Sequence, residues 1–160
     1  TKVNLIKKLS EYSGHQGIAG GQYLDLNYEK KKVSRNKIIE MEKKKTGMLF
    51  SFCCIAPAMI KNKKNLELKF FENIGSNIGL LFQISDDLID YRGNSKIAGK
   101  KTGKDQKKGK ATLISLLGYN NAVKYCNNLV INITGKLKKY GSNSKKIKQT
   151  LEYILNRDRW

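Results

Sequence analysis

Apolar residues recur every three or four positions through a long stretch of the sequence, from position 66 to position 91. This spacing predicts a single long amphipathic helix. No segment alternates apolar and polar residues with the period of a β-strand, and the chain contains one proline. A chain of 160 residues is long enough for one domain with a real core. The sequence therefore predicts an all-α protein, folded as a helical bundle.

The same spacing predicts four further helices, at about 1–12, 35–60, 119–140 and 143–157. Ser34 is expected to cap the second of these, and Ser142 or Asn143 the last. Residues 92–111 are rich in lysine and glycine and are predicted to be irregular. Gly75 and Gly79, four positions apart on the long helix, would allow the backbone of another helix to approach closely.

The net charge of +19 first suggests a nucleic-acid or lipid partner. Most of the 32 basic residues, however, are scattered lysines, and arginine is rare. We therefore predict no nucleic-acid partner. The longest apolar run, 48–60, is too short to span a membrane, so no stable membrane insertion is expected. The cysteines, Cys53, Cys54 and Cys126, lack metal-ligand spacing; a reduced cytoplasmic location is predicted, with Cys53 and Cys54 in the core.

Three aspartates stand on the long predicted helix: Asp86, Asp87 and Asp90. On a helix they share neighbouring parts of one face, and each like-charge pair would cost roughly 0.2–0.5 kcal/mol. A solvated acidic surface is one interpretation, but apolar residues surround the aspartates on most sides. We favour a site for a divalent cation, and oxygen ligands without His or Cys favour Mg²⁺ or Ca²⁺. Gln83, one turn earlier, could donate its amide to a ligand oxygen or to a carboxylate.

Three other motifs are weak alone. Lysines and glycines fill the segment 99–112, which could supply ammonium groups to a phosphorylated ligand or could be a solvated run of charge. The segment is not a Walker A loop. A Lys-Thr pair at Lys45-Thr46 could hold a phosphate if it faced a cavity. The glycines before Gln22 would permit close packing of helices or close approach of a ligand.

Taken in order, these motifs resemble the C-terminal half of the trans-isoprenyl diphosphate synthases, the polyprenyl synthetase family, over nearly all of the chain. The matching segments are Gly20-Gly21-Gln22-Tyr23-Leu24-Asp25-Leu26, Lys45-Thr46-Gly47, Phe82-Gln83, Asp86-Asp87-Leu88-Ile89-Asp90, Gly99-Lys100, Gly103-Lys104-Asp105 and Gly109-Lys110-Ala111-Thr112. The details look most similar to bacterial farnesyl or geranylgeranyl diphosphate synthases.

The resemblance implies an all-α isoprenoid synthase fold, usually a homodimer, that joins an allylic diphosphate to isopentenyl diphosphate. It implies Mg²⁺ as cofactor, with Asp86, Asp87 and Asp90 as ligands or beside the water shell of the metal. It also implies that Lys45 and Lys100 contact the allylic diphosphate, and that Thr46 and Gln83 face the reacting carbons. Lys110 is a further candidate for the metal or diphosphate region. Catalytic roles are thus expected for Lys45, Thr46, Gln83 and Lys100.

The chain departs from the family pattern because it lacks the first aspartate-rich motif. We therefore expect residues 1–160 to be the C-terminal half of one synthase domain, belonging to a longer protein and inactive without the N-terminal half. The expected activity is farnesyl diphosphate synthesis. Alternatives are synthesis of geranylgeranyl or longer diphosphates, a non-catalytic synthase subunit, a terpene cyclase and a basic nucleic-acid-binding bundle.

Overall fold

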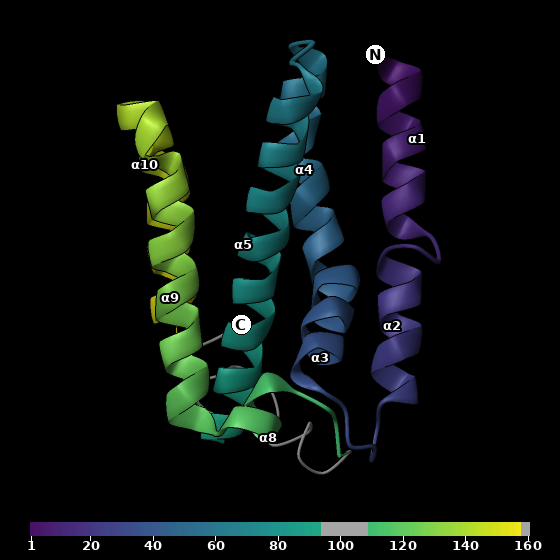
Figure 1. Ribbon diagram of the computed structural model, residues 1–160, viewed down its shortest axis with the longest axis vertical. Coiled ribbons are helices and arrows are strands. Elements are labelled where there is room, and N and C mark those ends of the chain that lie inside the picture. The colour runs from purple at the N-terminus through teal and green to yellow at the C-terminus, as the bar shows by residue number, and fades with distance from the viewer. Residues whose placement is uncertain (94–108, 158–160) are drawn as a thin grey trace. The chain divides into compact units, whose positions relative to one another are not determined.

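The computed structural model describes residues 1–93 and 109–157 (Figure 1). The described residues form helices and connections without a strand, as predicted. In chain order the elements are α1 (Lys2–Ser13), α2 (Ile18–Asn27), α3 (Arg35–Glu42), the π-helical turn η1 (Lys43–Gly47), α4 (Met48–Ile60), α5 (Asn65–Arg92), α8 (Leu113–Leu117), α9 (Tyr119–Leu137), the 3₁₀ segment η2 (Lys138–Ser144) and α10 (Lys145–Asn156). Within the described ranges, no helix is both long and apolar enough to cross a membrane.

The chain divides into two compact units, which are described separately below. The first comprises Thr1–Asn27 and Asn36–Leu80, and the second comprises Tyr28–Arg35 and Leu81–Trp160. Helix α5 contributes to both, with its N-terminal part in the first unit and its C-terminal part in the second. That all 160 residues belong to one synthase domain stays a prediction.

In the first unit, α1 packs against α4, and α2 packs against η1. Its buried apolar side chains come mainly from α3, α4 and the first part of α5: Ile38, Met41, Ile55, Ala58, Ile74, Ile78 and Leu80. Polar contacts join the same helices. The Tyr12 hydroxyl donates to the Glu72 carboxylate, and Ser51 Oγ donates to the Glu72 carbonyl at 3.1 Å. Burial and this hydrogen bond raise the pKa of Tyr12 above its ordinary value.

The stretch predicted as one helix from 35 to 60 contains a π-helical turn at Lys43–Gly47. The flanking residues Glu42 and Met48 have ordinary helical dihedrals, −64° and −40° for the first and −65° and −36° for the second. The turn is therefore a local widening of a continuous helix. Periodicity could not reveal it, because five residues are too few to show a change of period. Such turns are frequent at functional sites.

The predicted close approach at Gly75 and Gly79 is confirmed. A Cβ atom at Gly75 would lie 2.4 Å from the Phe50 carbonyl oxygen, and one at Gly79 would lie 2.5 Å from the Gly47 Cα. No side chain fits at these distances. These glycines therefore fix how closely α5 lies to the α4 segment within the first unit.

We expect Gly75→Ala to destabilise the protein by about 3 kcal/mol, because the new methyl group would push against backbone that cannot move aside locally. Gly135→Ala is the matched control, since a Cβ at this helical position meets nothing within 4 Å. The control should raise stability by about 0.5–1 kcal/mol, the usual gain when alanine replaces glycine in a helix. Urea denaturation measures the free energy of unfolding of both variants. Equal effects of the two substitutions would contradict the close contact between Gly75 and the Phe50 backbone.

In the second unit, α9 and α10 pack together and α8 packs against α9. The buried side chains of these helices, of the second part of α5 and of the segment before α8 are Leu81, Ile84, Leu88, Ile89, Ala111, Leu113, Ile114, Ala122, Cys126, Ile133, Leu137, Leu151 and Ile154. Helix α8 was not predicted, because five residues are too few to show periodicity. Its only sequence signal is the capping box, in which Thr112 and Ser115 exchange backbone and side-chain hydrogen bonds.

The break between the last two helices falls near Gly141, as predicted, and Gly141 has a positive φ of 53°. The predicted cap is wrong. Helix α10 begins at Lys145 after Ser144, not after Ser142 or Asn143, and Ser144 Oγ donates to the Gly141 carbonyl at 2.7 Å. The 3₁₀ turn that follows α9 uses the intervening residues, and this shift could not be read from composition.

The cysteines are free thiols. Cys126 is buried and Cys54 is half-buried, but Cys53 is exposed, so the prediction that it belongs to the core is wrong. Successive residues on a helix point in directions about 100° apart, so adjacent cysteines cannot both face the same core. Burial, and to a smaller extent the neighbouring Cys53, raise the pKa of Cys54 to about 11.

Cys54 should therefore resist alkylation at pH 8. With a pKa of about 11 only about 0.1 % of it is thiolate, against about a quarter of an ordinary cysteine. We expect iodoacetamide to label Cys54 at least 100-fold more slowly in the folded protein than in urea. The rate in the folded protein should rise about tenfold per pH unit toward pH 11. Peptide mass spectrometry measures both rates, and equal labelling of folded and unfolded protein would contradict the raised pKa.

Candidate functional site

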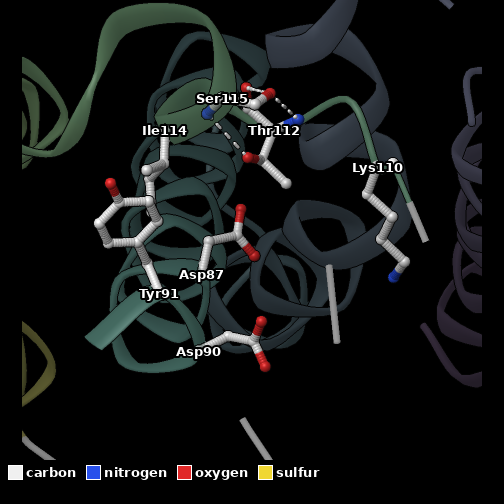
Figure 2. A pocket seen from close by; sticks show the side chains of 8 residues that line it. Asp87, Asp90, Tyr91, Lys110, Thr112, Ile114 and Ser115 are labelled. Carbon is white, nitrogen blue, oxygen red and sulfur yellow. Dashed lines mark hydrogen bonds between the residues drawn. The ribbon is translucent and has the colours of Figure 1, made fainter. Parts of the chain in front are cut away.

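A pocket of about 280 Å³ lies in the second unit, between the C-terminal part of α5 and the segment that leads into α8 (Figure 2). The pocket combines acidic, basic and hydroxyl groups with one apolar and one aromatic side chain. Its lining residues are Asp87, Asp90, Tyr91, Gly109, Lys110, Thr112, Ile114 and Ser115. The pocket contains two of the three aspartates singled out from the sequence.

Asp87 and Asp90 are one helical turn apart on α5, so both carboxylates project from the same side of the helix. Figure 2 shows the two carboxylates pointing toward the side of the pocket from which Lys110 projects. Each aspartate is only 6 % exposed. The intervening residues Leu88 and Ile89 are buried in the apolar core, which fixes the rotation of α5 about its axis. The prediction that these acids face the interior rather than bulk solvent is thus confirmed for two of them.

Gln83 lies one turn before Asp87, and its Nε2 donates to Asp87 Oδ1 at 2.9 Å. Of the two partners considered for this amide, a carboxylate is the one observed. A neutral donor at that position orients the Asp87 carboxylate.

Asp86, unlike Asp87 and Asp90, is partly exposed. Its Oδ1 accepts a hydrogen bond from Nη2 of Arg157, the residue that follows α10. Asp86 is not among the residues that line the pocket. The sequence offered no reason to distinguish the three aspartates, whereas the tertiary structure separates one from the other two.

Lys110 lines the pocket, and the preceding residue, Gly109, fixes the path of the backbone there. The Gly109 carbonyl accepts a hydrogen bond from the Lys30 backbone N–H at 2.8 Å, and Gly109 has a positive φ of 66°. Glycine suits this conformation, since other residues adopt it only with strain. The capped N-terminus of α8 follows at Thr112. The position of Lys110 therefore results from two local constraints rather than from a long helix.

In the first unit, Lys45 belongs to η1, and its Nζ pairs with Asp25 Oδ2 of α2 at 2.7 Å. The Asp25 side chain is 7 % exposed and that of Lys45 is 22 % exposed. The two helices meet closely because a Cβ at Gly21 would lie 2.1 Å from the Lys45 backbone nitrogen. Thr46 is the next residue of η1 and is half-buried. The weak glycine and Lys-Thr motifs of the sequence are thus neighbours in space.

The structure brings Gln83, Asp87, Asp90 and Lys110 to one place in the second unit. It places Lys45 and Thr46 in the first unit, and Lys100 lies outside the described residues. The sequence interpretation missed Asp25 and Arg157. Asp25 stood inside a quoted motif next to leucines, a signal that it was buried, but nothing in the sequence indicated the partner of Arg157.

The donor set at the pocket fits a hard divalent cation, since Asp87 and Asp90 present buried carboxylates on one helix face. Among the described residues, no group of three or more His, Cys, Asp or Glu side chains is arranged to hold a metal ion. The two carboxylates can therefore supply part of a coordination shell, and the remaining ligands would be water or phosphate oxygens.

The fold and this pocket define an all-α protein with an aspartate-bearing helix beside a basic segment. The sequence matches the polyprenyl synthetase family over residues 1–154, and the chain belongs to this family. It is similar to the farnesyl diphosphate synthases of Micrococcus luteus, at 32 % identity over 158 residues, and Escherichia coli, at 31 % over 162 residues. Each match covers 99 % of this chain and 54 % of the relative.

Solved structures agree with this assignment. A geranyltransferase from Helicobacter pylori, complexed with magnesium and isoprenyl diphosphate, matches with a TM-score of 0.80 and 29 % identity. The alignment covers 96 % of this chain and 50 % of the geranyltransferase. An FPP/GFPP synthase from Zymomonas mobilis matches with a TM-score of 0.80 and 33 % identity, over 95 % of this chain and 50 % of that one. The predicted family and the all-α isoprenoid synthase fold are confirmed, and the chain spans about half the length of these relatives.

Proposed function

We propose that this chain supplies the second aspartate-bearing half of a trans-prenyltransferase, which joins an allylic diphosphate to isopentenyl diphosphate and releases pyrophosphate. The observation that carries the proposal is the pocket with two buried carboxylates and a lysine on opposite sides. Such a site suits a cation–diphosphate complex, since the carboxylates attract a divalent cation and the lysine attracts phosphate oxygens. Similarity to farnesyl diphosphate synthases supports the same reaction class.

The residues of this chain would act mainly by positioning charge. Bound Mg²⁺ would neutralise the negative charge that gathers on the departing pyrophosphate. Asp87 and Asp90 would hold the cation, and the amide of Gln83 keeps the Asp87 carboxylate oriented. Lys110 would attract diphosphate oxygens, and the apolar core behind α5 would keep water from the allylic cation. Lys45, held by Asp25, and the neighbouring Thr46 are proposed for the allylic substrate, as is Lys100.

Farnesyl diphosphate is the product we favour, because the relatives in Micrococcus, Escherichia and Bacillus are farnesyl diphosphate synthases. Geranylgeranyl diphosphate is the second candidate, supported by the geranylgeranyl pyrophosphate synthase of Geoglobus acetivorans at 36 % identity over 107 residues. We further propose Mg²⁺ as the cofactor, a homodimer as the assembly and the cytoplasm as the location.

Calorimetric titration with geranyl S-thiolodiphosphate, an unreactive allylic analogue, tests the proposal. We expect the chain to bind it in the presence of Mg²⁺ and to lose at least about tenfold in affinity when EDTA removes the metal. Geraniol, which lacks the diphosphate, is the control and should bind far more weakly. Binding that is indifferent to both EDTA and the diphosphate would overturn the proposed function.

We expect no product from this chain alone when it is incubated with Mg²⁺, dimethylallyl diphosphate and isopentenyl diphosphate. Two carboxylates hold only part of a metal site, and the chain corresponds to about half of its relatives. A chimera in which this chain replaces the matching half of the Micrococcus luteus synthase should form product. Incorporation of radiolabelled isopentenyl diphosphate measures that product. Normal turnover by the isolated chain would contradict the division of the site between two halves.

A further inference from the structure

Arg157 follows the last residue of α10, and its side chain turns back onto α5. The side chain is 6 % exposed. Its Nη2 pairs with Asp86 Oδ1 and also donates to the Phe82 carbonyl at 3.0 Å, while Nε donates to Ser85 Oγ at 3.3 Å. The guanidinium carbon lies 4.0 Å from the centroid of the Phe82 ring. One buried arginine therefore holds the helix turn that immediately precedes Asp87.

The position of this arginine is fixed from both helices. Ser85 Oγ donates to the Ile154 carbonyl at 2.7 Å, and the Arg157 backbone N–H donates to the Tyr153 carbonyl at 3.0 Å. The first bond satisfies a carbonyl of the last turn of α10 from outside the helix, and the second closes that turn. The guanidinium is thus preorganised, and its planar set of donors meets a carboxylate, a carbonyl and a hydroxyl together.

The positive charge of Arg157 affects all three aspartates of α5. Asp86 is adjacent to Asp87 and one turn before Asp90, so three negative charges would otherwise repel one another in a partly desolvated place. The guanidinium offsets part of this charge. The same positive charge repels a divalent cation at the pocket and occupies a carboxylate oxygen that such a cation would attract.

We propose that Arg157 is the internal counter-cation of the aspartate helix. It positions Asp86 when no metal is bound, and it opposes a divalent cation that binds at Asp87 and Asp90. This inference rests on the proposed metal-binding role of those two residues. Opposed binding is reciprocal, so the cation must weaken the Arg157–Asp86 pair by the same factor by which the pair weakens cation binding.

The test uses Mg²⁺ alone as the probe and four forms of the chain. Arg157→Met keeps the length of the stem and removes the charge, Arg157→Lys keeps a charge, and Lys146→Met removes an exposed charge from α10 as the control. We expect Arg157→Met to lower the melting temperature in EDTA and to tighten the Kd for Mg²⁺ about fivefold or more. Arg157→Lys and Lys146→Met should stay within about twofold of the wild-type Kd.

A residue that merely anchors α10 would lower the melting temperature without changing the Kd for Mg²⁺. Unchanged affinity in Arg157→Met, with measurable binding by the wild type, would therefore overturn this inference and leave the proposed function standing. Absence of Mg²⁺ binding in every form would overturn both. The Arg157 Nε–H resonance of the wild-type chain gives a second measurement that needs no variant. It should move on Mg²⁺ titration, and a constant resonance during saturation of the site would refute the opposed binding.

Discussion

Replacing Asp87 and Asp90 together by asparagine should reduce the Mg²⁺-dependent affinity for geranyl S-thiolodiphosphate by at least about 100-fold, because the charged oxygens proposed to hold the cation are lost. The free energy of unfolding without metal should not fall. Two carboxylates one turn apart, each 6 % exposed, repel each other in the metal-free protein, and the neutral amides relieve this repulsion. Calorimetry and urea denaturation give the two quantities.

The combination of lost affinity and retained stability makes the result specific. Glu152→Gln is the matched control, because it removes an exposed carboxylate from α10 in the same unit. This control should change neither quantity. Retained Mg²⁺-dependent affinity in the double variant would show that the pocket aspartates do not hold the cation. A large loss of stability would instead assign them a structural role.

Lys45→Met should destabilise the protein by about 2–3 kcal/mol, because it deprives the buried Asp25 carboxylate of its ammonium counter-charge. Breaking a fully buried pair costs about 3–5 kcal/mol, and the 22 % exposure of the Lys45 side chain lowers the expectation. Asp25→Asn combined with Lys45→Met should recover at least about half of the loss, since the buried negative charge is then absent as well. Urea denaturation of Lys45→Met, Asp25→Asn and the double variant measures this coupling.

The neighbouring Lys44 provides the control. Its Nζ pairs with Glu40 Oε1 at 3.0 Å, but the Glu40 side chain is 60 % exposed, so Lys44→Met should cost only about 0.5 kcal/mol. If Lys44→Met and Lys45→Met were equally costly, the Asp25–Lys45 pair would not be the feature that joins α2 to η1. Preserved binding of the allylic analogue by a folded Lys45→Met variant would remove Lys45 from the proposed substrate site.

Most of the helices and the family could be predicted from the sequence because both depend on local order along the chain. Helical spacing locates α5 to within a residue or two, since a long run of apolar positions fixes its period. The aspartates could be assigned to one face for the same reason. Short or irregular elements could not be predicted: α8 and the π-helical turn each have five residues, too few to show a period.

Helical periodicity is a property of neighbouring residues, so an all-α chain with Asp86, Asp87 and Asp90 on a single helix could be predicted without any knowledge of packing. The partner of each charged group, in contrast, depends on the packed fold. In the folded protein Asp87 and Asp90 line a pocket, Asp86 pairs with Arg157, and Lys45 pairs with Asp25. The members of each pair are distant in the chain, so their pairing depends on how the helices pack. Burial adds a second requirement, because a buried charge is costly unless an opposite charge lies beside it.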